Sequence, residues 1–197
     1  IMTKAIYILF IPLLSFIYQI FFGKRLKENT PYVSIFLMLT VLLASLSILI
    51  NKISDHVPER ANLSWLSTGN FNIDLGIYID GITAIMLVVV SLISFLVHLY
   101  SVEYMKGDTR YSRYFAFLGL FTFSMNGIVL SDSLVMMYIF WELVGLSSFL
   151  LIGFWFEKVS AANASKKAFL INRVGDIGMF IGIMILFFVT GTFNIEG

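Results

Sequence analysis

Long runs of apolar residues, separated by short polar segments, dominate the pattern along the chain. A helix needs about 20 mostly apolar residues to cross the hydrocarbon core of a bilayer, because each residue advances it by about 1.5 Å. Six runs meet this requirement, so the sequence predicts an all-α membrane protein with six transmembrane helices. The predicted helices are Ala5–Phe22, Tyr32–Ile50, Gly81–Tyr100, Tyr114–Leu130, Leu134–Phe156 and Ala168–Thr190.

A signal peptide is the alternative interpretation of the first run, because Lys4 precedes it. The run is longer than the apolar region of a signal peptide, which has about 7–15 residues, and no small-residue cleavage motif follows it. We therefore expect the first run to be a membrane anchor.

The connection from Asn51 to Asp80 is long and follows a different pattern. After a Thr-Gly-Asn turn at 68–70, apolar residues alternate with others from Phe71 to Ile79. This alternation predicts a β-hairpin whose first strand is Leu63–Ser67. An open sheet edge cannot face lipid, so we expect the hairpin outside the membrane, as a cap over helix ends. The chain is thus divided into residues 1–50 (two helices), 51–80 (the hairpin loop) and 81–197 (four helices).

Basic residues are distributed unequally between the two sides of the predicted membrane domain. Because cytoplasmic loops are enriched in Lys and Arg, the richer side is predicted to be cytoplasmic, with both ends of the chain outside. That side holds Lys24, Arg25, Lys27, Lys106, Arg110, Arg113, Lys158, Lys166 and Lys167, and the other holds Lys4, Lys52 and Arg60.

Composition excludes several classes of function. Hydrophobic residues make up 59% of the chain, the mean hydropathy is +0.92, and only 13% of residues are charged, which is about half the share in soluble proteins. A net charge of +1 without a basic patch argues against a nucleic-acid partner. The chain has no cysteine and only two histidines, with no metal-binding or phosphate-binding motif. We therefore expect no cofactor and no metal in this chain.

Glu142 is the most unusual residue in the predicted helices. It lies eight residues into its helix, about 12 Å from the start and near mid-membrane. A charge there costs about 2.5–3.5 kcal/mol on insertion scales, and no Lys or Arg lies within one turn. Its partner must come from another helix, or the carboxyl must be protonated. Such a group can take up and release a proton; a structural hydrogen bond from a neutral Glu is the alternative.

Three further ionisable residues are candidates for a proton path. Arg173 and Asp176 share one face of the last helix, where they can pair either as a structural aid to insertion or as a switch. His98 lies near the end of the third helix, and its unperturbed pKa of about 6.5 suits proton transfer. Glu103, one turn further along, is expected to be solvated. The candidate site residues are therefore Glu142, Asp176, Arg173 and His98.

The order and spacing of five motifs resemble one family. The chain is similar to the N-terminal part of the antiporter-like subunit, called L or chain 5, of proton-pumping NADH:quinone oxidoreductase (respiratory complex I). Its one departure is Phe140, where the family usually has glycine before Trp-Glu. The resemblance rests on Asp80–Thr83, His98–Met105, Tyr111–Phe115, Trp141–Trp155 and Lys166–Gly178.

The resemblance implies an incomplete antiporter-like inverted-repeat fold that moves protons as quinone is reduced, with no redox chemistry in this chain. Glu142 resembles a family carboxylate that pairs with a lysine on a broken seventh helix, beyond Gly197, so we expect a fragment. Arg173 and Asp176 resemble a pair near the neighbouring antiporter-like subunit. The implied partners are other membrane subunits of complex I, lipid and protons. The implied location is a bacterial cytoplasmic membrane, or alternatively the mitochondrial inner membrane.

Two other functions stay open at this point. The large subunit of a multi-subunit Na⁺/H⁺ antiporter shares the same motifs, so the choice between H⁺ and Na⁺ is not made by these residues. A purely structural membrane anchor is the third interpretation, and the uncompensated charge of Glu142 argues against it.

Overall fold

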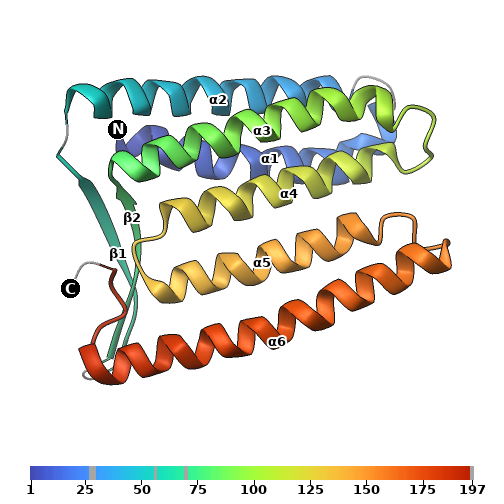
Figure 1. Cartoon of the computed structure of the whole chain (residues 1–197). Coiled ribbons are helices and arrows are strands. Elements are labelled where there is room, and N and C mark those ends of the chain that lie inside the picture. Colours follow the sequence, from blue (N-terminus) through green and yellow to red (C-terminus); the bar gives the residue numbers. More distant parts are fainter. Residues whose placement is uncertain (27–29, 56, 69–70, 196–197) are drawn as a thin grey trace.

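A computed structural model describes residues 1–26, 30–55, 57–68 and 71–195. Within these residues, six helices and one antiparallel pair of strands follow one another along the chain (Figure 1). The predicted turn residues Gly69 and Asn70, and also Lys27 and His56, lie outside the described residues. The elements are α1 (Met2–Leu26), α2 (Thr30–Ser54), β1 (Glu59–Thr68), β2 (Phe71–Ile79), α3 (Gly81–Tyr104), α4 (Tyr111–Leu130), α5 (Leu134–Ile152) and α6 (Val159–Thr190).

All six helices are long and apolar enough to cross a membrane, which confirms the predicted fold class. Many of their large apolar side chains point outward: Phe36, Ile82 and Phe188 are 64%, 73% and 83% exposed. Such exposure would be costly in water but is normal where lipid tails cover the surface.

α4 is the central helix and packs against α1, α3 and α5, while α6 packs mainly against α5 at one side (Figure 1). The core between α1 and its neighbours includes Ile8, Ile48 and Leu87, which are fully buried. α1 and α4 approach closely at Gly119, where a Cβ atom would lie 3.0 Å from the Pro12 carbonyl oxygen. A larger residue at 119 would therefore separate the two backbones.

Side chains and a glycine define three helix ends. Asp80 precedes α3 and accepts a hydrogen bond from the Thr83 amide at 2.7 Å, and Ser133 does the same for Met136 at 3.3 Å before α5. Both satisfy backbone donors that the first helical turn leaves unpaired. α6 ends at Thr190 and is followed by the capping residue Gly191, whose φ of 72° is a conformation that glycine adopts without steric cost.

Each helix differs from its predicted bounds at one end or both, and the last two differ in ways that change the connection between them. α5 ends at Ile152 instead of Phe156, and α6 begins at Val159 instead of Ala168. The additional residues of α6, Val-Ser-Ala-Ala-Asn-Ala-Ser-Lys-Lys, are too polar to be identified by a search for membrane-length apolar runs. They make α6, with 32 residues, longer than the stretch of about 20 residues that crossing the hydrocarbon core requires.

The hairpin lies across one end of the helices, as expected for a cap (Figure 1). β1 is longer than predicted and pairs with β2 from Glu59↔Ile79 to Thr68↔Phe71. Arg60 Nε donates to Asp132 Oδ2 at 2.6 Å, and the Asp132 amide donates to the Gly76 carbonyl at 3.2 Å. Asp132, 1% exposed, therefore fastens both strands to the connection between α4 and α5.

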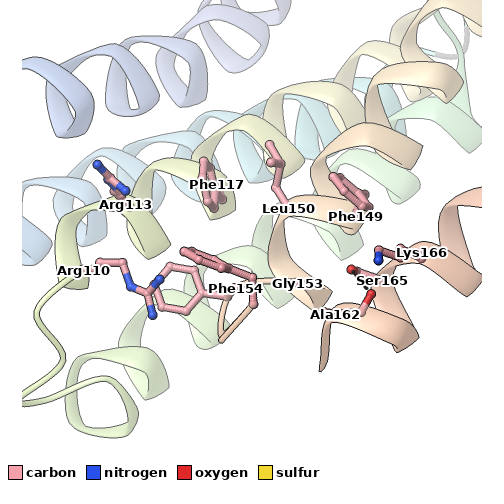
Figure 2. Close-up of a pocket in the computed structure, with 11 residues that line it drawn as sticks. Arg110, Arg113, Phe117, Phe149, Leu150, Gly153, Phe154, Ala162, Ser165 and Lys166 are labelled. Carbon is pink, nitrogen blue, oxygen red and sulfur yellow. Dashed lines mark hydrogen bonds between the residues drawn. The ribbon is translucent and has the colours of Figure 1, made fainter. Parts of the chain in front are cut away.

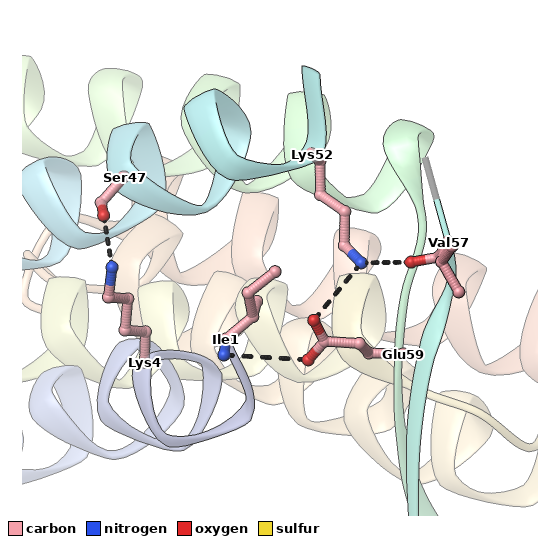
Figure 3. A network of polar contacts seen from close by, with 6 residues as sticks. All are labelled: Ile1, Lys4, Ser47, Lys52, Val57 and Glu59. Atoms are coloured by element: carbon pink, nitrogen blue, oxygen red, sulfur yellow. Dashed lines mark hydrogen bonds and ion pairs between the residues drawn. The ribbon is translucent and has the colours of Figure 1, made fainter. Parts of the chain in front are cut away.

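A second polar network joins α1 and α2 to β1 at the same end (Figure 3). Lys52 Nζ donates to the Val57 carbonyl at 2.6 Å and lies 3.7 Å from Glu59 Oε1. The Ile1 amino group lies 3.8 Å from Glu59 Oε2, and Lys4 Nζ donates to Ser47 Oγ at 2.5 Å. We call this side, with the hairpin, the hairpin end.

At the opposite end, here called the basic end, the α3–α4 connection contacts the α5–α6 connection. Trp155 Nε1 donates to Asp108 Oδ2 at 2.9 Å, and Arg110 pairs with Glu157 at 2.8 Å. Burial by itself would raise the pKa of Asp108, but hydrogen bonds from Trp155 and the Arg110 amide, together with the Arg110 charge, hold it below its usual value. Asp108 therefore stays ionised, and keeps this contact, at neutral pH. Glu103 is exposed and paired with Lys106 at 3.3 Å, as its predicted solvation implies.

Candidate functional site

α5 and α6 run antiparallel, and four side-chain contacts fix how they face each other. Along the two helices from the hairpin end to the basic end, the first and last contacts are between aromatic rings and the two middle contacts are polar. The ring centroids lie 5.6 Å apart in the first contact and 5.3 Å apart in the last. The four contacts are Tyr138 with Phe180, Trp141 with Asp176, Glu142 with Arg173, and Phe149 with Phe169.

Glu142 forms an ion pair with Arg173 across the two helices, through Oε2 and Nη1. Glu142 is near the middle of α5, and its side chain is 22% exposed. The Arg173 guanidinium also lies over the Phe169 ring, 4.8 Å from its centroid. The cation that pairs with Glu142 comes from another helix, one of the two possibilities that the sequence left open.

The expected pairing of Arg173 with Asp176 is replaced by two contacts to α5. Asp176 is 5% exposed and accepts a hydrogen bond from Trp141 Nε1 at 3.1 Å, while Arg173 extends to Glu142. Both side chains do lie on the face of α6 that meets α5, as their spacing predicts. The difference arises because Glu142 has no cation on its own helix, whereas Asp176 already has a neutral donor.

The site holds more negative than positive side chains. Asp176 interacts electrostatically with both Glu142 and Arg173, but among the described residues Arg173 forms its ion pair with Glu142. The Tyr138 side chain, one turn before Glu142, interacts with the Glu142 carboxylate. A second positive charge is needed to neutralise this cluster when both carboxyl groups are ionised.

His98 belongs to a different network, between α3 and α4. It is 1% exposed, and its Nδ1 lies 2.8 Å from the Ser94 carbonyl oxygen, which assigns a proton to Nδ1. Ser94 Oγ in turn lies 2.7 Å from Thr122 Oγ1 on α4. His98 Nε2 is buried without a hydrogen-bond partner among the described residues.

Several residues of these networks were not among the predicted site residues. Trp141 directly precedes Glu142 in the sequence, and Tyr138 lies one turn before it, so their positions along the helix could have suggested both. Ser94 and Thr122 are ordinary small polar residues on separate helices, and only their contact across α3 and α4 identifies them. Within the described residues, no three His, Asp or Glu side chains gather as a metal site would require.

Phe140, the departure from the family pattern, packs into a space left by a glycine on α4. A Cβ atom at Gly127 would overlap the Phe140 ring. The ring also meets Phe123 edge-on, with centroids 5.4 Å apart. Phe140, which stands where the family usually has glycine, is thus accommodated by Gly127 on α4, so α4 and α5 still pack together.

Two family models match the chain. Residues 65–115 match "NADH-Ubiquinone oxidoreductase (complex I), chain 5 N-terminus", and residues 131–197 match "NADH:quinone oxidoreductase/Mrp antiporter, TM". The chain belongs to the chain 5 family of complex I. Among curated members, the chloroplastic NAD(P)H-quinone oxidoreductase subunit 5 of Chlorokybus atmophyticus is 43% identical over 94% of this chain, and that of Physcomitrium patens is 46% identical over 88%. The chain spans 30% and 24% of these two relatives.

Two solved structures share the arrangement of the helices and the hairpin. A chain of the membrane-bound sulfane sulfur reductase, an archaeal respiratory membrane complex, superposes with a TM-score of 0.84 at 19% identity, covering 96% of this chain and 38% of that one. A chain of the Mrp complex from Dietzia sp. DQ12-45-1b superposes with a TM-score of 0.82 at 18% identity, covering 99% and 20%. At these identities the likeness concerns the fold.

Proposed function

We propose that this chain forms part of a proton-translocating membrane subunit of an NADH:quinone oxidoreductase, with Glu142 as a proton-transfer group. The observation that carries the proposal is the cluster between α5 and α6, in which Arg173 pairs with Glu142 while a second carboxyl group, Asp176, lies close by and has Trp141 as its hydrogen-bond donor among the described residues. The uncompensated negative charge lies where the dielectric constant is low, so a proton is the simplest species to balance it. The family matches and the named relatives support the redox-driven context.

The position of Arg173 determines how the cluster handles a proton. While Arg173 contacts Glu142, the guanidinium compensates negative charge on the carboxylate. If another charge draws the guanidinium towards Asp176, one turn further along α6, Glu142 loses its counter-ion and binds a proton. When Arg173 returns, that proton leaves. Electron transfer takes no part in these steps.

The test is Glu142→Gln in the full-length subunit within its complex. Gln keeps the shape and hydrogen bonding but cannot ionise, so we expect the number of protons moved per NADH oxidised to fall while the subunit still inserts. Glu142→Asp should retain part of the proton transfer. Glu103→Gln is the matched control, because Glu103 is an exposed carboxylate at the end of α3. If Glu142→Gln moved as many protons per NADH as the native subunit, Glu142 would be a structural residue.

Sodium–proton exchange is the second candidate, supported by the fold likeness to the Mrp complex and the family match over residues 131–197. The same cluster could then be balanced by Na⁺. The two candidates are separated by measuring sodium uptake into vesicles under a pH gradient without NADH. Uptake that is lost in Glu142→Gln would favour exchange, and its absence in the native protein would favour the redox-driven function.

We further propose that the partners are neighbouring membrane subunits of such a complex, and that the membrane is a bacterial cytoplasmic membrane. The named relatives are chloroplastic, so a plastid membrane is the alternative. Fractionation of the source cells, followed by immunodetection of the subunit, distinguishes the two locations.

A further inference from the structure

A cleft of about 390 Å³ opens at the basic end between α4, the end of α5 and the beginning of α6 (Figure 2). It lies apart from Glu142 and its partners, which do not line it. Three cationic and several aromatic side chains form its walls. Among these are Arg110, Arg113, Lys166, Phe117, Phe149 and Phe154.

The three cations differ in whether they are already compensated. Arg110 pairs with Glu157 and lies 5.4 Å and 4.9 Å from the Phe154 and Phe156 ring centroids, so it is held in place. Arg113 and Lys166 form no side-chain hydrogen bond or ion pair with any described residue. The cleft therefore presents uncompensated positive charge beside apolar walls, which favours an anion that also carries apolar groups.

The cleft lies at the depth of the lipid headgroups. α6 has 32 residues and is therefore about 48 Å long, compared with about 30 Å for the hydrocarbon core. Its polar first turns, which carry Lys166, extend beyond that core at the basic end. Trp155 lies in the adjacent connection, at the level where aromatic residues commonly meet the membrane interface.

We propose that this cleft binds an anionic phospholipid from the leaflet at the basic end. The phosphate would contact Arg113 or Lys166, and an acyl chain would cover Phe117, Phe149 and Phe154. Basic pockets between transmembrane helices on the positively charged side are suited to such headgroups. A soluble anion would use the cations but would leave the aromatic walls uncovered. The proposal holds for either function considered above.

The experiment uses the full-length subunit in its complex, reconstituted into nanodiscs that contain a photoactivatable phosphatidylglycerol. Crosslinked peptides are identified by mass spectrometry. We expect labelling of the peptides that carry Phe117 and Phe149, and the double variant Arg113→Gln/Lys166→Gln should reduce it about tenfold or more, since each basic residue contributes about 1 kcal/mol to anionic-lipid binding. Lys167→Gln is the matched control, because Lys167 neighbours Lys166 but does not line the cleft.

Three results would overturn the proposal. Equal labelling by a phosphatidylcholine probe would reduce the cleft to an apolar groove, and displacement of the probe by inorganic phosphate would make it a soluble-anion site. Absence of labelling in the native protein would mean that another segment or subunit covers the cleft. Selective labelling by phosphatidylglycerol that the double variant loses, and that Lys167→Gln retains, would establish the lipid site.

Discussion

Arg173 pairs with a carboxylate on the neighbouring helix although its own helix offers Asp176 three residues away. Spacing within one helix can be read from the sequence, and it correctly placed both residues on one face. The partner across the helices depends on how α5 and α6 align, which local patterns do not determine. For the same reason the sequence indicated Glu142 as a site residue but not Trp141 as the donor to Asp176.

Removing one member of the Glu142–Arg173 pair should reveal the free-energy cost of leaving the other charge unpaired in the membrane. Arg173→Gln leaves Glu142 without its cation, and a single charge in the helix interior costs about 2.5–3.5 kcal/mol on insertion scales. We expect less inserted subunit in membranes for Arg173→Gln, and partial recovery in Glu142→Gln/Arg173→Gln. Quantitative immunoblotting of washed membranes measures both. Equal loss in the single and double variants would show that the two charges do not compensate each other.

The contact between Trp141 and Asp176 should behave as one hydrogen bond. Trp141→Phe removes the indole donor and Asp176→Asn weakens the acceptor, and either should lower stability by about 1–3 kcal/mol, because a buried hydrogen bond is lost and its remaining partner is left unsatisfied. In the double variant the losses should not add, since both remove the same interaction. Thermal unfolding of the purified complex measures this, and additive losses would mean that the residues act separately.

The elements were predictable where one physical rule determines them. Six membrane-length apolar runs gave six helices, and the alternation in Phe71–Ile79 gave a strand with those bounds. The first turns of α6 were not predicted, because they are helical but too polar to belong to an apolar run. β1 begins at Glu59, earlier than predicted, because its pairing follows β2 rather than its own weak alternation.

The packing of α4 on α5 should depend on the small size of Gly127. A methyl group at 127 would overlap the Phe140 ring, and overpacking of this kind costs about 1–3 kcal/mol. Gly127→Ala should therefore lower the thermal stability of the complex, and Gly127→Ala/Phe140→Leu should lose less than the two single variants together. Gly145→Ala is the control, since a Cβ atom there would have no packing neighbour within 4 Å among the described residues. If Gly127→Ala and Gly145→Ala lowered the thermal stability equally, the packing of the Phe140 ring against Gly127 would not explain the loss.

At the scale of the whole molecule, the two ends carry their charges differently. At the hairpin end, Lys52 pairs with Glu59 and Arg60 pairs with Asp132. At the basic end, Arg113, Lys166 and Lys167 form no ion pair with the described residues. Net positive charge is thus concentrated at one end, and this is the quantity that correlates with the cytoplasmic side.

This asymmetry predicts the orientation of the protein in its membrane. Val57 is 65% exposed at the hairpin end, and Thr109 is exposed in the α3–α4 connection at the basic end. These 197 residues contain no cysteine, so Val57→Cys and Thr109→Cys each introduce one thiol, once any cysteines elsewhere in the full-length subunit are replaced. A membrane-impermeant maleimide added outside intact cells or vesicles of native orientation should label position 57 and not 109. Labelling of both after permeabilisation is the control for reactivity. The reverse pattern in intact membranes would place the basic end outside, and the lipid cleft would then face the opposite leaflet.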